Sequence, residues 1–259
     1  MFSVYHCVWL VICGCLMILA VVWLRRRRPS LDWVLSVACV GCVLSELTKV
    51  FSVIQLVPSA DGSMVYPYLP LQHLPLHLCS IQIVMIFYAR FAHEGRMREA
   101  VLAFMYPTCL LGAFLALLMP SIYGSSIAVS KSFTHPLAYQ YFLYHTMLVV
   151  LGVSIPLSGQ TTIRARHYFS TLALLGGLAF ASLYFNAMFA VPTYENGELV
   201  RVEYVTNFMF TYQPPLSIAL TELWQWYVYV AVIAVLAVVL IGCCYLPFWR
   251  RERQAKKIA

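Results

Sequence analysis

Seven long runs of apolar residues constrain the fold of this chain more than any other feature. They cover residues 4–24, 31–57, 73–91, 99–119, 138–157, 168–191 and 220–247. A helix needs roughly 20 apolar residues to cross a bilayer. Only 10% of the residues are charged, too few for a soluble domain, in which about 25% are charged. We therefore expect an all-α, polytopic integral membrane protein, a seven-transmembrane-helix bundle that forms one domain over residues 1–259.

The basic residues predict the orientation of this bundle. Fourteen of the 17 Lys and Arg residues fall at one set of span ends, whereas Lys131 and Arg201 fall at the other. The positive-inside rule places the basic ends in the cytoplasm, so the N-terminus is expected outside and the C-terminus inside. The net charge of +7 then needs no nucleic-acid partner. Membrane lipids are the expected partners, including anionic lipids of the inner leaflet.

The loop over residues 192–219 carries a local strand signal. Polar and apolar residues alternate on both sides of Asn196-Gly197. This pair is typical of two-residue hairpin turns. We expect a short extracytoplasmic hairpin there. The chain has no Asn-x-Ser/Thr glycosylation sequence, which fits a bacterial cytoplasmic (inner) membrane without establishing it.

Polar residues within the predicted spans gather at one depth. Ionisable groups in a membrane are costly and mark functional sites by default. At about 1.5 Å per residue, the predicted span limits place them all in the outer half of the bilayer. They are Glu46, Lys49, His77, Cys79, Gln82, His145 and Asn186. This convergence predicts a single polar cavity that opens toward the outer leaflet, in which Lys49, Gln82 and Asn186 would contact the substrate.

Structural explanations compete with functional ones at each position. Glu46 and Lys49 are three residues apart and can simply neutralise each other on one helix face, while Gln82 and Asn186 can bridge helices. His73 and His77 have the spacing of a metal pair, but Pro75 between them disrupts that geometry. We expect no metal and no cofactor.

Cys79 differs from the other cysteines because it follows prolines that mark the entry to the third span. A helix beginning at Pro75 would place Cys79 about one turn in, where the helix dipole favours a thiolate. His145, at matching depth on another span, is the better candidate for a general base than His77, which faces away. Glu46 could orient that base, as in hydrolase triads. Lys49 could stabilise an oxyanion or hold a phosphate.

Three short segments resemble the signatures of the YwaF-like integral membrane family. They are Leu74-Pro75-Leu76-His77-Leu78-Cys79, Tyr141-Phe142-Leu143-Tyr144-His145, and Asn207-Phe208-Met209-Phe210 with Pro214. The seven-span order and Glu46 also match. The resemblance implies that Cys79 accepts an acyl group, that His145 and His77 belong to the catalytic site, and that Asn207 lies in the substrate region. It also points to an animal branch assigned cysteine-dependent acyl transfer on ether phospholipids.

Three functional hypotheses follow. The first is a cysteine-dependent acyltransferase or acyl hydrolase that acts on membrane lipid, with Cys79 and His145 as nucleophile and base. The alternative is a transporter or ligand-binding membrane protein that uses the Glu46/Lys49 pair without covalent chemistry. The third is a structural or assembly subunit whose polar groups only fix helix packing.

Overall fold

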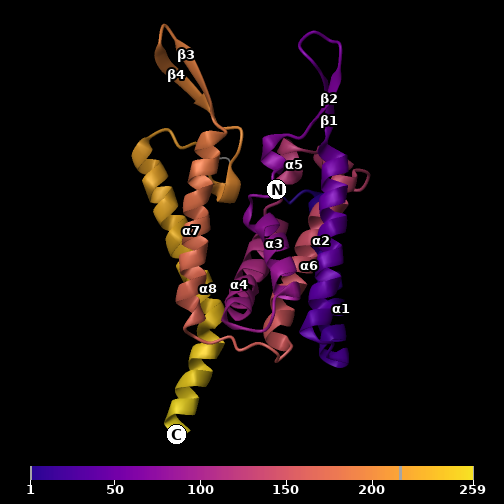
Figure 1. Cartoon of the computed structure of the whole chain (residues 1–259), viewed down its shortest axis with the longest axis vertical. Helices are drawn as coiled ribbons and strands as arrows, with labels where there is room; N and C mark the ends of the chain where they lie inside the picture. Colours follow the sequence, from indigo (N-terminus) through magenta and orange to yellow (C-terminus); the bar gives the residue numbers. More distant parts are fainter. Residues whose placement is uncertain (1, 216–217, 259) are drawn as a thin grey trace.

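A computed structural model describes residues 2–215 and 218–258. The chain is mainly helical (Figure 1). Its long helices are α1 (Val4–Arg27), α2 (Leu31–Val53), α3 (Leu78–Phe91), α4 (Arg96–Leu118), α6 (Pro136–Leu157), α7 (His167–Met188) and α8 (Leu223–Ile258). The short helical elements are η1 (Leu71–His73), α5 (Ile122–Ser125), η2 (Val129–Lys131) and η3 (Phe208–Phe210). Six helices, all of these long ones except α3, are long and apolar enough to cross a membrane, which confirms a polytopic membrane protein.

The entry to α3 differs from the sequence prediction. The third span was expected from residue 73, but α3 begins at Leu78 and has 14 residues, about 21 Å of helix. That length falls short of a hydrocarbon core of about 30 Å, so α3 is not a complete span by itself. The helix is shortened because Pro67, Pro70 and Pro75 hold the preceding chain in extended segments and the single turn η1.

Two β-hairpins project from the same end of the molecule, the hairpin end (Figure 1). Strand β1 (Gln55–Pro58) pairs antiparallel with β2 (Val65–Tyr68), so the second span ends at Val53 and not at residue 57. Strand β3 (Val191–Glu195) pairs with β4 (Glu198–Glu203). Asn196 and Gly197 join these strands with φ values of 52° and 85°, as a two-residue turn of this kind requires.

The core lies where α6 packs against α1, α2 and α4. The α4–α6 contact depends on Gly152: a Cβ atom there would lie 2.7 Å from the Leu110 nitrogen. Small residues permit such close backbone approach between membrane helices. Trp9 of α1 stacks on Phe142 of α6, with ring centroids 4.8 Å apart, and fixes the position of α1.

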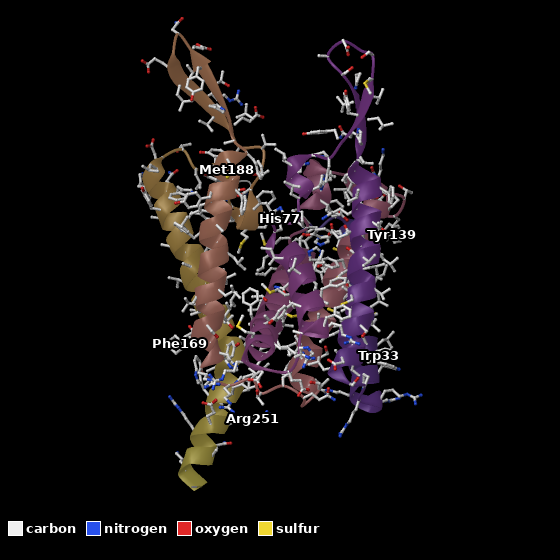
Figure 2. The ribbon with its side chains drawn as sticks, viewed as in Figure 1. Trp33, His77, Tyr139, Phe169, Met188 and Arg251 are labelled. Atoms are coloured by element: carbon white, nitrogen blue, oxygen red, sulfur yellow. The ribbon has the colours of Figure 1, made fainter. Side chains whose placement is uncertain are left out.

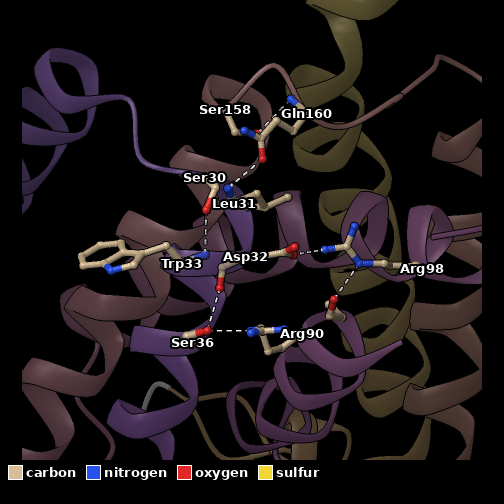
Figure 3. Close-up of polar contacts among 10 residues, drawn as sticks. Ser30, Leu31, Asp32, Trp33, Ser36, Arg90, Arg98, Ser158 and Gln160 are labelled. Atoms are coloured by element: carbon tan, nitrogen blue, oxygen red, sulfur yellow. Dashed lines mark hydrogen bonds and ion pairs between the residues drawn. The ribbon is translucent and has the colours of Figure 1, made fainter. Parts of the chain in front are cut away.

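The opposite end, where Trp33 and Arg251 lie (Figure 2), we call the basic end. Polar contacts near the start of α2 tie the helices together (Figure 3). Arg98 forms an ion pair with Asp32 at the start of α2, and Arg90 donates to the Ser36 hydroxyl. The two arginines thereby join α2 to the segment from α3 to α4.

Helices α7 and α8 form a separate pair beside the α1–α6 bundle (Figure 1). Toward the basic end the Tyr245 hydroxyl donates to the Ala103 carbonyl at 2.9 Å, and Tyr106 donates to the Cys244 carbonyl at 2.9 Å. Toward the hairpin end η3 packs against α7. α8 continues to Ile258, well past the predicted limit at residue 247.

Candidate active site

The first turn of α3 forms the centre of the candidate site. His77 is the N-cap residue, so Cys79 is the second residue of the helix and not a full turn into it. The first backbone hydrogen bond of this turn runs from Ile81 N–H to the His77 carbonyl at 2.9 Å. Within the described chain, the N–H groups of residues 78–80 have no backbone acceptor. The Cys79 side chain is therefore flanked by unpaired donors at the positive end of a helix dipole.

Helix α6 contacts this turn directly. The Tyr144 hydroxyl donates a hydrogen bond of 2.8 Å to the Cys79 carbonyl. The next residue, His145, is buried, and its Nδ1 lies 2.7 Å from the Tyr141 carbonyl oxygen. A carbonyl only accepts, so Nδ1 must carry the proton, and Nε2 of the neutral ring keeps its lone pair. This is the tautomer that a general base needs at Nε2.

His77 occupies the space between α3 and the chain below β3 and β4 (Figure 2). Its ring packs edge-on against Phe208, with centroids 5.1 Å apart, and lies 6.2 Å from Phe210. It is also close enough to His145 and Lys49 for electrostatic interaction. The structure thus brings His77 and His145 into one neighbourhood. Among the described contacts, no hydrogen bond joins an imidazole to the Cys79 sulfur.

Glu46 and Lys49 pair with each other on α2. Their side-chain atoms are 2.7 Å apart, with 30% of the Glu46 side chain and 11% of the Lys49 side chain exposed. Burial, together with the positive charge of Lys49, lowers the pKa of His73 in the chain that enters α3. Because the Tyr141 carbonyl accepts the hydrogen bond from His145 Nδ1–H, the described contacts do not give Glu46 the orienting role considered from the sequence.

Gln82 holds α3 to α4. Its side chain is fully buried, donates to the Thr108 hydroxyl at 2.9 Å and accepts from the Cys109 thiol at 3.2 Å. These bonds give both atoms of the amide a partner, which fits the helix-bridging explanation; the substrate contact predicted for Gln82 stays a prediction.

Asn186 and Asn207 shape the segment around η3. The buried Asn186 side chain accepts from the Phe208 N–H at 2.8 Å and from the Thr206 hydroxyl, and it donates to the Phe208 carbonyl and the Thr211 hydroxyl. Asn207 bonds to the backbone of Tyr212 and Gln213. Both amides therefore position the loop that carries Phe208 against His77.

Two residues of the site, Tyr141 and Tyr144, were not among the sequence candidates. Both lie on α6 close to His145, and their rings are 4.2 Å and 5.6 Å from it between centroids. The aromatic run before His145 was the only sequence signal for them. In the described part of the chain, no group of three or more His, Cys, Asp or Glu residues has the arrangement of a metal site.

The outer-half polar cavity expected from the sequence stays a prediction. Two hollows among the described residues are apolar. One lies among α1, α2 and α6, lined by Trp23, Trp33, Met147 and neighbouring aliphatic residues. The other, which we call the α2–α3 groove, has a volume of about 280 Å³. It is lined by Cys39, Val40, Val43, Leu44 and Phe87.

Comparison with known proteins decides the family. The model of the TMEM164 family matches residues 1–245. The chain belongs to the TMEM164 family. No curated protein and no solved structure matches the chain.

This finding corrects the resemblance drawn from the sequence. The match over nearly the whole chain is to the TMEM164 family and not to a YwaF-like family. The L-P-L-H-x-C segment at residues 74–79 and the two weaker segments therefore do not assign the chain to the YwaF-like family. The expectation of a bacterial inner membrane loses the support of that resemblance, and the six long apolar helices establish only that this is a membrane protein.

Proposed function

We propose that this TMEM164-family protein is a thiol-dependent acyltransferase or acyl hydrolase acting on membrane lipid. One observation carries the proposal: Tyr144 holds the first turn of α3, with Cys79 in it, against α6 next to His145. In this proposal the Cys79 thiol, at this helix N-terminus, is within reach of the lone pair on His145 Nε2, which would act as its base.

The first half of the reaction forms a thioester. His145 Nε2 takes the thiol proton while the Cys79 sulfur attacks the ester carbonyl carbon of a lipid. The carbon–oxygen bond of the tetrahedral intermediate then breaks, and the leaving alcohol takes the proton back from the imidazolium. In the second half, a lipid hydroxyl or water gives its proton to His145 and attacks the thioester. The carbon–sulfur bond breaks, and the released thiolate is reprotonated by the imidazolium.

The start of α3 can stabilise the oxyanion. The N–H groups of residues 78–80 lack backbone acceptors, and such donors stabilise developing negative charge when they are fixed in advance. Tyr144 fixes them by its bond to the Cys79 carbonyl. No charged side chain is required for this step, which leaves the Glu46–Lys49 pair outside the bond-breaking chemistry.

The orientation in this proposal follows the basic residues. With the basic end in the cytoplasm, the candidate site and both hairpins face the outer leaflet. Cysteine substitutions at exposed residues test it: in intact cells, an impermeant thiol reagent should modify Leu199→Cys in β4 and spare Arg251→Cys in α8. The reverse pattern would invert the orientation.

The decisive experiment detects the acyl-enzyme. Purified protein in lipid nanodiscs is incubated with a phospholipid that carries an alkyne-tagged acyl chain, and the modified peptide is identified by mass spectrometry. We expect a hydroxylamine-sensitive adduct on Cys79, absent from Cys79→Ser. It should fall about a hundredfold or more in His145→Gln, as expected for loss of a general base. Cys243→Ser, which removes an exposed thiol on α8, is the matched control.

Two outcomes would contradict the proposal. The first is similar, slow labelling of exposed cysteines such as Cys7 and Cys243, with no dependence on His145. The second is a protein that binds or moves a lipid without any adduct and loses that activity in Glu46→Gln, which would favour the transporter hypothesis.

A further inference from the structure

The α2–α3 groove begins immediately below the candidate site. On α2, Leu44 and Val43 lie two and three residues before Glu46. Glu46 is near Tyr144, which bonds to the Cys79 carbonyl. The upper end of the groove therefore lies about one helical turn from the level of the nucleophile.

The groove then runs along both helices toward the basic end. Phe87 lies eight residues after Cys79, about 12 Å farther along α3. The other end of the groove on α2 is formed by Cys39 and Val40. An extended octanoyl chain is shorter than the distance from Cys79 to Phe87, whereas an extended octadecanoyl chain is longer.

The groove is open to the bilayer. Val40 is 60% exposed and Leu44 is 59% exposed, and every lining residue is apolar or a cysteine. A chain already in the membrane can enter sideways without leaving an apolar medium. Burial in the groove then adds little hydrophobic free energy, because lipid tails are as apolar as the lining residues. Any discrimination between acyl chains of different length must therefore come from the shape of the groove.

We propose that the α2–α3 groove receives the acyl chain of the lipid whose carbonyl carbon is attacked by Cys79, and that it sets the preferred chain length. This rests on the proposed function, because the thioester determines where the chain begins. The occupant is a linear hydrocarbon chain, since the groove offers no polar side chain for a headgroup and its upper end lies about one helical turn from the level of Cys79.

The length preference is tested with substitutions at two heights. Leu44→Trp blocks the groove near the site, and Val40→Trp blocks it farther away. We expect both to lower the ratio of octadecanoyl to octanoyl thioester on Cys79 by about threefold to tenfold, the range of methylene-scale discrimination in an apolar pocket. Leu44→Trp should shorten the longest accepted chain more. Val235→Trp on α8, at a valine that is 63% exposed, is the matched control and should leave the ratio unchanged.

A second readout does not depend on catalysis. A phospholipid with a diazirine on its acyl chain is photolysed in nanodiscs with Cys79→Ser, and the crosslinked peptides are mapped. We expect enrichment at residues 39–44 and at Phe87 over residues around Val235. Uniform crosslinking would overturn the proposed role of the groove. So would a ratio of octadecanoyl to octanoyl thioester that neither groove substitution alters. Enrichment without any thioester in the wild type would instead remove the proposed function and leave a lipid-binding groove.

Discussion

Removing the Asn186 side chain tests whether α7 holds η3 in place. The amide makes four hydrogen bonds to the chain over residues 206–211, two of them to the Phe208 backbone. Each hydrogen bond contributes about 1 kcal/mol net, and a buried donor left unpaired costs about 1–3 kcal/mol. Membrane-embedded pairs average only about 0.6 kcal/mol. We therefore expect Asn186→Ala to lower the free energy of unfolding by about 2–4 kcal/mol.

The assay needs a global and a local measurement. Reversible unfolding in mixed micelles gives the free energy, and hydrogen exchange over residues 206–213 reports whether η3 has detached. Asn207→Ala is the control, because Asn207 is partly exposed and water can replace its loop bonds; it should cost about 1 kcal/mol or less. A loss for Asn186→Ala as small as that of the control, with exchange unchanged, would refute the reasoning.

Three further predictions follow from individual contacts. Gly152→Ala should destabilise the protein by about 1–3 kcal/mol, because the added Cβ would meet the α4 backbone. Gly176→Ala, where a Cβ would have nothing within 4 Å, should not destabilise it. Thermal unfolding in detergent measures both effects. Hydrogen bonds from two serine hydroxyls lower the pKa of Asp61 to about 2. The β1–β2 turn should therefore stay ordered below the usual carboxyl pKa of about 3.9 and lose its order as pH falls through about 2. Carbon NMR of the labelled Asp61 carboxyl checks this. Tyr144→Phe should fold normally yet slow acylation of Cys79 about tenfold by loosening the oxyanion donors, and an unchanged single-turnover rate would contradict that role.

The helices could be predicted from the sequence because membrane spans are encoded locally. A run of about 20 apolar residues satisfies its own backbone, and Asn196-Gly197 is a local turn signal as well. The β1–β2 hairpin was missed for a related reason. The apolar residues of β1 directly follow α2, so the sequence assigned them to the second apolar run, residues 31–57. Asp61-Gly62, with Gly62 at φ 70°, was nevertheless a turn signal in the sequence.

For the candidate site, the sequence could predict only how deep each polar residue lies in the membrane. The sequence predicts Cys79, His77 and His145 at one level. In the structure Tyr144 bonds to the Cys79 carbonyl, and His77 lies within electrostatic range of the buried His145; their joint role in one site stays a prediction. The orientation of each side chain depends on contacts between distant segments. The Tyr141 carbonyl, and not Glu46, accepts the hydrogen bond from His145 Nδ1–H, and Asn186 bonds to a loop 20 residues away. Residue spacing in one chain carries no information about such partners.

The order in which the chain is made has a consequence for the first turn of α3. Its neighbours are synthesised late: Tyr144 lies 65 residues after Cys79, and Phe208, which covers His77, comes later still. During membrane insertion the first turn of α3 therefore emerges long before Tyr144, which bonds to the Cys79 carbonyl, and before Phe208, which packs on His77. Products that stop before η3 contain Cys79 and His77 without Phe208, so the packing around the start of α3 is complete only once η3 has been made.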